Sequence, residues 1–228
     1  PVFKYIPEFK NLTVKKRKKP KPVKNHVKII DLLRHSAGLN FKGPDDYRKV
    51  IDLSLEEYTK ESIKSPLKFE PGTTWWYSYA TDICGYLIEV LSQEKLDVFL
   101  KSRIFDPLEM NDTFFELPNS KLDRLTTLYV VDENKELVSF DNKTNTPFKD
   151  KVILLNGSGG LLSTTDDYLK FSFMLLNNGL YNEKQIIKKE TLDLMKEDHS
   201  LGLKYKKLAF GKKKGFGLGF EVVKEDGT

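Results

Sequence analysis

Apolar residues recur every three or four positions in several stretches of the chain, a pattern typical of helices that bury one face. The clearest stretch predicts a helix from about Ala80 to Ser92, whose buried face collects Ile83, Leu87, Val90 and Leu91. The same spacing predicts shorter helices over about 29–38, 55–63, 96–104 and 188–196. Another helix is expected to begin at a capping box, Ser163 to Asp166, and to end near Gly179.

Strand signals are fewer than helix signals. Residues 66–76 are expected to be extended and rich in turns, and residues 125–139 to form a hairpin around Asp132, Glu133 and Asn134. The segment GFGLGFEVV, residues 215–223, predicts a strand for which the sequence offers no obvious partner nearby. The pattern therefore predicts a mainly helical chain whose sheet is completed by residues outside this sequence.

Length and composition fit a globular protein with one large domain or two small lobes. The chain has 228 residues, of which 39% are hydrophobic and 31% are charged. Apolar runs of about 18 residues, as a membrane span needs, do not occur. The single cysteine, Cys84, rules out an intrachain disulfide and falls in an apolar helical pattern that indicates a buried thiol. Three histidines without H-E-x-x-H spacing give no reason to expect a metal or another cofactor.

Positive charge is concentrated in two runs, although the net charge is only +5. The first holds Lys15, Lys16, Arg17, Lys18, Lys19, Lys21 and Lys24, and the second holds Lys204, Lys206, Lys207, Lys212, Lys213 and Lys214. Such runs can attract nucleic acid or another polyanion. The first run contains two prolines and no aromatic residue on which a base could stack, so a solvated loop is favoured over nucleic-acid binding.

Four blocks in a fixed order carry a resemblance to a known family. They are KIIDLLRHSAGL (28–39), FEPGTTWWYSYATDICGYLIEVLSQEKLDVFLKSRIFDPLEMNDTFF (69–115), GSGGLLSTTDDYLKFSFMLLNNG (157–179) and GFGLGF (215–220). Together they resemble the penicillin-recognising serine hydrolases of the class C β-lactamase type. The branch that looks most similar is the β-lactamase-like esterases and transesterases, called family VIII carboxylesterases.

The resemblance implies an α+β fold, in which a helical lobe lies beside an antiparallel sheet flanked by helices. It also implies acyl transfer from a small ester or amide substrate to a serine, followed by release of the acyl group to water or an alcohol. In this family the serine and a lysine form an S-x-x-K motif. A tyrosine from a second motif, Y-x-N in the lactamases and peptidases, completes the proton relay.

Tyr77 falls on the tyrosine of that second motif, and Tyr79 stands where the asparagine would be, so the resemblance implies that Tyr79 contacts the substrate. A tyrosine lacks the amide donor and acceptor pair that helps to hold a β-lactam or peptide side chain, so this departure favours an esterase. We expect the turn at Pro71 and Gly72 to aim Tyr77 across the cleft, with Trp75 and Trp76 packed beneath it. The alternative for Tyr77 is an ordinary core aromatic.

The glycine-rich stretch GSGG is expected to form a tight turn beside the cleft, where Gly159 and Gly160 touch the substrate. The stretch lacks the Lys-Ser/Thr pair of a phosphate-binding P-loop. In the family the block around His35 is a structural helix end. No aspartate stands at a spacing from His35 that would indicate a catalytic pair, so a structural role is favoured over a catalytic one.

The nucleophile motif is missing from the expected position, which precedes the block that matches KYIPEFKNLTV. Two S-x-x-K strings do occur, Ser65 to Lys68 and Ser92 to Lys95, and we interpret both as chance matches in a lysine-rich chain. The family strand with its K-T-G, H-x-G or W-G-G motif, which follows GFGLGF, is also missing. Residues 1–228 are therefore expected to be the central portion of one catalytic domain. The alternative is an inactive relative that binds cell-wall peptide or a polyanion, and polyanion binding would weaken steeply with salt.

Overall fold

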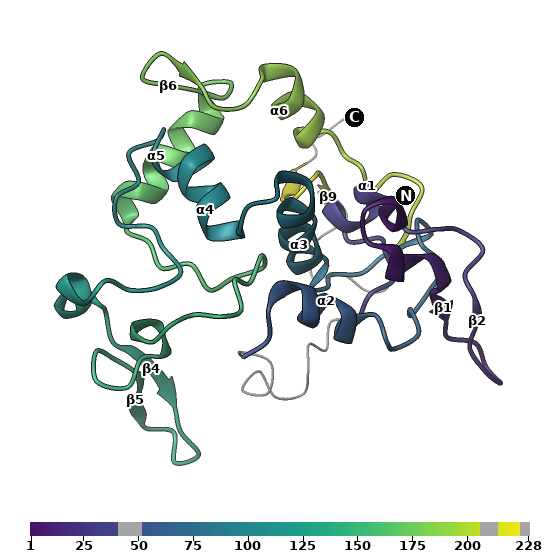
Figure 1. The fold of residues 1–228 in the computed structure, drawn as a ribbon, viewed down its shortest axis with the longest axis horizontal. Coiled ribbons are helices and arrows are strands. Elements are labelled where there is room, and N and C mark those ends of the chain that lie inside the picture. The colour runs from purple at the N-terminus through teal and green to yellow at the C-terminus, as the bar shows by residue number, and fades with distance from the viewer. Residues whose placement is uncertain (41–51, 206–213, 224–228) are drawn as a thin grey trace.

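A computed structural model of the protein describes residues 1–40, 52–205 and 214–223. Its helices are α1 (Ile29–Leu33), α2 (Leu55–Ser62), α3 (Ala80–Ser92), α4 (Leu96–Leu100), α5 (Thr165–Leu176) and α6 (Lys189–Lys196). Helix α4 continues into a π-helical turn, Lys101–Phe105. Figure 1 shows α3 at the centre of the molecule, and α3 contacts α1, α2 and α4.

Among the described residues, the strands are short and form five separate pairs. Four pairs are antiparallel: β1 (Thr13–Val14) with β2 (Lys21–Pro22), β4 (Leu128–Val131) with β5 (Leu137–Asp141), β6 (Leu180–Tyr181) with β7 (Lys184–Gln185), and β9 (Lys214–Phe216) with β10 (Glu221–Val223). The fifth pair, β3 (Thr74–Trp75) with β8 (Lys204–Tyr205), is parallel. The expected α+β class is confirmed, in the form of helices with small and mainly antiparallel sheets.

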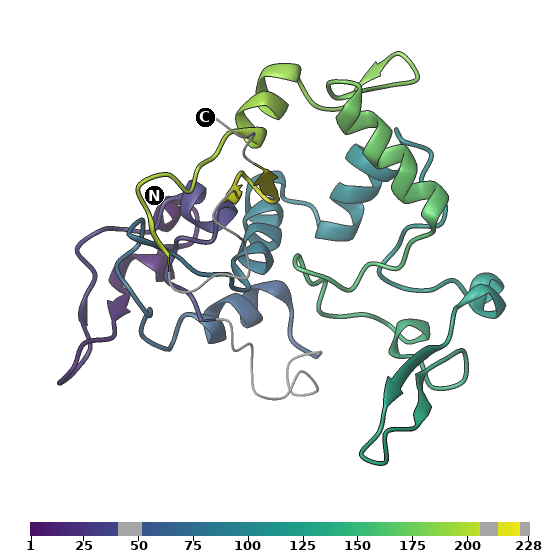
Figure 2. The ribbon, with the colours of Figure 1, turned by 180° about the vertical axis from the view of Figure 1, so that it is seen from behind.

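In the part of the chain that the structure describes, the hydrophobic core is divided among three clusters. The largest packs α1 and the buried face of α3, including Ile83 and Leu87, against the first residues of the chain. The second joins α2 to Leu96, Phe115 and Leu154, and the third joins Phe105 to Met174 of α5. Seen from behind in Figure 2, α4 and α5 lie to one side of α3, and the N-terminal segment lies to the other. Helix α3 is thus the element that both parts of the molecule share.

Periodicity predicted the helices correctly, and the differences lie at their ends. Helix α1 ends at Leu33 rather than near Gly38, because His35 takes a left-handed backbone conformation with φ of 55°. Helix α5 is capped one residue later than expected, since the Thr164 side chain accepts the Asp167 N–H at 3.3 Å. Its last turn ends at Leu176, shortly before Gly179.

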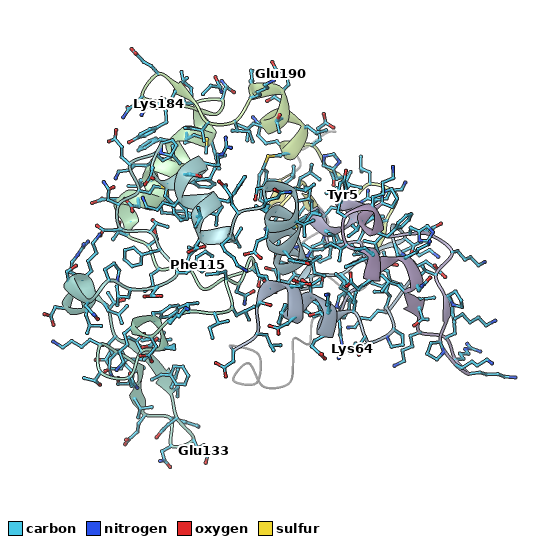
Figure 3. The ribbon with its side chains drawn as sticks, in the orientation of Figure 1. Tyr5, Lys64, Phe115, Glu133, Lys184 and Glu190 are labelled. Carbon is cyan, nitrogen blue, oxygen red and sulfur yellow. The ribbon has the colours of Figure 1, made fainter. Side chains whose placement is uncertain are left out.

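The prediction of one unpaired strand over 215–223 was wrong. The segment folds back on itself, so that β9 and β10 pair in register from Phe216 and Glu221 to Lys214 and Val223. Gly219 has φ of 101°, a backbone conformation that side-chain-bearing residues rarely adopt, and this allows the reversal. The hairpin predicted around Asp132 was right, and the Asp132 side chain accepts the backbone N–H groups of Asn134 and Glu136. Figure 3 shows Glu133 at the tip of this projecting hairpin.

The structure also describes Cys84 and the start of the second lysine run. Burial raises the pKa of the Cys84 thiol to about 12, so this thiol stays protonated at neutral pH. Within the described ranges, no helix has the length and apolar character needed to cross a bilayer. Most of the second lysine run, residues 206–213, lies outside the described residues.

Candidate active site

The segment between β3 and α3 positions Tyr77. A turn precedes β3, in which Gly72 has φ of 77° and donates its N–H to the Ser36 carbonyl at 2.9 Å. The chain then runs along β3 and reaches Tyr79, the N-cap residue that precedes α3. The Tyr77 side chain is 50% exposed, whereas Trp75 is 2% exposed with its ring centroid 6.3 Å from that of Tyr77. Trp75 is therefore buried beside Tyr77, which is accessible to solvent. Trp76, which was expected to pack there too, has its ring under Lys68 Nζ at 3.8 Å.

His35 lies directly beside Tyr77, a contact that the sequence did not reveal. The His35 and Tyr77 ring centroids are 4.5 Å apart, and Phe216 lies edge-on to His35 at 5.3 Å. Two hydrogen bonds connect His35 to the Tyr77 segment: its carbonyl accepts the Trp76 N–H at 2.9 Å, and its Nδ1 accepts the Ser78 N–H at 3.4 Å. Because Nδ1 is an acceptor, the proton of the neutral ring is on Nε2. His35 thus holds the backbone on both sides of Tyr77.

A buried ion pair fixes the loop that carries His35. Asp31 is 2% exposed and accepts hydrogen bonds from Arg34 Nη2 at 2.9 Å and from the Ser36 hydroxyl at 2.8 Å. Arg34 also donates to the carbonyl of His199 at 3.1 Å. Since the Ser36 carbonyl accepts the Gly72 N–H, this network joins the end of α1 to the turn before β3.

Burial keeps His35 neutral and lowers its pKa from 6.5 to about 4. Because the pKa of this histidine is lower in the folded state than in the unfolded chain, the free energy of unfolding is at its full value above pH 6.5, where the histidine is neutral in both states. This free energy falls as the pH drops from 6.5 to about 4, because the unfolded chain takes up the proton first. The expected loss in the free energy of unfolding is about 3 kcal/mol.

Denaturant titrations between pH 6.5 and 4 would measure this loss. In the variant His35→Gln the free energy of unfolding should change less with pH. An equally steep change in the variant would assign the effect to other groups.

The glycine-rich loop packs against the first turn of α3. Ser158 donates its N–H to Asp82 Oδ1 at 2.6 Å. A Cβ on Gly157 would lie 2.4 Å from the Thr81 carbonyl oxygen, so only glycine fits there. Gly160 has φ of 83° and faces Phe115, which Figure 3 labels, whereas a Cβ on Gly159 would meet no heavy atom within 4 Å. The structure thus brings Gly157 and Ser158 to the first turn of α3. Contact of Gly159 and Gly160 with substrate stays a prediction.

Tyr79 is turned away from this arrangement towards α2. Its hydroxyl donates to the Ser62 carbonyl at 3.2 Å, and its ring lies edge-on to Tyr58 at 6.2 Å. Burial raises the pKa of Tyr79, which keeps the hydroxyl protonated. The structure therefore does not group Tyr79 with Tyr77, and the expected contact of Tyr79 with substrate stays a prediction.

The two S-x-x-K strings of the sequence place their serines, Ser65 and Ser92, in different parts of the fold. Ser92 ends α3 and donates its hydroxyl to the Ile88 carbonyl at 2.7 Å. A helix rises about 1.5 Å per residue, so Ser92 is on the order of 20 Å from the Tyr77 end of α3. Ser65 is exposed in the turn after α2, and Lys68 of the same string lies over the Trp76 ring at 3.8 Å. Among the described residues, no group of three histidine, cysteine or acidic side chains could hold a metal ion.

Comparisons with known proteins agree on one family and one fold. The family model described as Beta-lactamase matches residues 1–228. An Escherichia coli K12 protein named "Putative D-alanyl-D-alanine carboxypeptidase" is 28% identical over 228 residues, which cover 89% of this chain and 50% of that protein. A Mycobacterium tuberculosis protein is also 28% identical, over 213 residues that cover 89% of this chain and 53% of that protein. The chain thus spans about half the length of the curated relatives it matches.

Two solved structures have the same fold at low sequence identity. One is EstCE1, a hydrolase with promiscuous acyltransferase activity, with a TM-score of 0.72 and 22% identity. The match covers 98% of this chain and 62% of EstCE1. The other is simvastatin synthase from Aspergillus terreus, with a TM-score of 0.74 and 20% identity, and the match covers 99% of this chain and 62% of the synthase.

Proposed function

This chain belongs to the beta-lactamase family, whose members include serine hydrolases, and on that premise we propose that its parent protein is a serine acyl hydrolase that prefers esters to β-lactams. We propose further that residues 1–228 are the central part of its catalytic domain, and that the nucleophilic serine and lysine lie outside them. The observation that carries the proposal is the half-exposed Tyr77, held at the start of α3 by His35.

In the proposed reaction the serine oxygen attacks the carbonyl carbon of the ester, and Tyr77 relays the proton of the serine hydroxyl. The bond from the carbonyl carbon to the alcohol oxygen breaks, and the alcohol leaves with that proton. An acyl-enzyme remains, and water then attacks it and releases the acid. Gly159 and Gly160 line the acyl group in this proposal, which the open space at Gly159 supports.

The preference for esters rests on position 79. An asparagine there would offer an amide to the side chain of a β-lactam or peptide, whereas Tyr79 uses its hydroxyl on the Ser62 carbonyl. We expect kcat/KM for p-nitrophenyl butyrate to exceed that for nitrocefin by at least about 100-fold, roughly the discrimination that lost polar contacts can give. Steady-state assays of both substrates on one preparation would test this. Equal or reversed values would assign the protein to the lactamases or peptidases instead.

A polyanion-binding function has weaker support. The first lysine run forms the exposed hairpin of β1 and β2, and Lys16 lies 3.5 Å from Glu70. These side chains have the exposure of an ordinary solvated surface, so this function stays an alternative without an observation that favours it.

A further inference from the structure

Asp82 is a buried carboxylate that the proposed reaction does not use. It is the third residue of α3 and is 1% exposed. Among the described residues no lysine or arginine forms an ion pair with it. Burying a carboxylate without a counter-ion costs several kcal/mol unless hydrogen bonds satisfy its oxygens. The position therefore needs partners that compensate this cost.

The compensating partners of Asp82 come from two elements, and two of them belong to the glycine-rich loop. The Ser158 N–H donates to Oδ1 at 2.6 Å. The Asn156 amide, oriented with its nitrogen towards the carboxylate, lies 3.2 Å from Oδ2. The Tyr58 side chain of α2 is the third group beside Asp82, where it favours the charged form of the carboxylate. Asp82 thus ties residues 156–158 to the first turn of α3.

Close packing supports the same contact from the loop side. A Cβ on Gly157 would lie 2.4 Å from the Thr81 carbonyl oxygen and 3.2 Å from the Asp82 Cα atom. The loop backbone therefore approaches the helix as closely as a glycine allows. Beyond this anchor the chain reaches Gly159, where a Cβ would have no heavy atom within 4 Å.

We propose that Asp82 is a positioning residue that clamps the 156–160 loop to the start of α3 and so holds in place Gly159 and Gly160, which line the acyl group in the proposed reaction. This inference rests on the proposed function. The Tyr77 segment has its own anchor in His35, through Trp76 and Ser78. The loop and Tyr77 are thus held by separate residues, and loss of the Asp82 clamp moves the loop while Tyr77 stays in position.

The separate anchors give a kinetic signature that a merely structural role would not produce. In the full-length protein, Asp82→Ala is expected to raise KM for p-nitrophenyl butyrate about tenfold or more and to change kcat less than threefold, the pattern of lost ground-state binding. Asp82→Asn, which keeps an acceptor for the Ser158 N–H, should restore most of the affinity. Gly157→Ala displaces the loop from its own side and should reproduce the rise in KM. In the double variant, Asp82→Ala with Gly157→Ala, the rise in KM should be much smaller than the two single rises combined, because both substitutions break the same contact between the loop and α3.

Hydrogen exchange of the Ser158 amide tests the clamp without any enzyme assay. The amide should be protected in the wild type and in Asp82→Asn, and should exchange at least about tenfold faster in Asp82→Ala and Gly157→Ala, with the α3 amides unchanged. Undiminished protection at Ser158 would overturn the clamp. Lost protection with unchanged KM would overturn its role in positioning. If no variant or wild type turns over esters, the proposed function fails, and the exchange data still decide whether the clamp exists. Should Asp82→Ala not fold, Gly157→Ala and Asp82→Asn carry the same comparison.

Discussion

Replacing Tyr77 by phenylalanine in the full-length protein is expected to lower kcat for ester hydrolysis by about 10²–10⁴-fold, the usual contribution of a general acid or base. The substitution removes only the hydroxyl, and the ring keeps its packing against His35 and Trp75. KM and the unfolding midpoint should therefore change little. Stopped-flow measurement of acyl-enzyme formation would show whether the lost step is the attack on the ester.

Tyr5→Phe is a suitable control for the Tyr77 variant. Tyr5 is 42% exposed, similar to Tyr77 at 50%, and lies in the N-terminal segment labelled in Figure 3. It should leave kcat unchanged. If Tyr77→Phe also left kcat unchanged, Tyr77 would be a packing residue and the proton relay would have to use another group.

Asp31→Ala is expected to give the largest loss of stability, about 3 kcal/mol in the free energy of unfolding. The substitution leaves Arg34, whose side chain is 19% exposed, without its counter-ion, and it leaves the Ser36 hydroxyl without an acceptor. The effect should spread to the turn at Gly72, because Ser36 connects the two segments. Denaturant unfolding would measure the loss.

The matched control for Asp31 is Asp193→Ala on α6. Asp193 also pairs with basic residues, Lys189 and Lys196, but its side chain is 43% exposed. Exposed pairs contribute little, so the unfolding midpoint should hardly move. Similar losses in both variants would mean that burial does not strengthen the Asp31 network.

The sequence predicted the helices better than the strands, for a physical reason. Helix α3 follows from local spacing alone, since Ile83 and Leu87 must share a face. The segment 215–223 continues to alternate across its turn, so only the backbone conformation of Gly219 shows that it is a hairpin. The local pattern therefore could not distinguish one continuous strand from a hairpin of two strands.

The contacts within the candidate site could not be predicted from the sequence. The family resemblance singled out Tyr77 and the 157–160 loop, but no spacing links His35 to Tyr77 or Asp82 to Ser158. Both contacts are made across long stretches of sequence by the packing of α1 and the loop around α3. For Tyr79 the motif position was known from the sequence, but it did not indicate that the hydroxyl donates to the Ser62 carbonyl.

The proposal of an acyl-enzyme with a nucleophile outside residues 1–228 is tested most directly by locating the adduct. The full-length protein would be treated with a fluorophosphonate, digested and analysed by tandem mass spectrometry. One modified serine is expected, in an S-x-x-K motif outside residues 1–228, with no modification of the 228-residue chain expressed alone. An adduct on Ser65 or Ser92, lost on substitution of that serine by alanine, would contradict the proposal, and so would a full-length protein that forms no adduct while it hydrolyses esters.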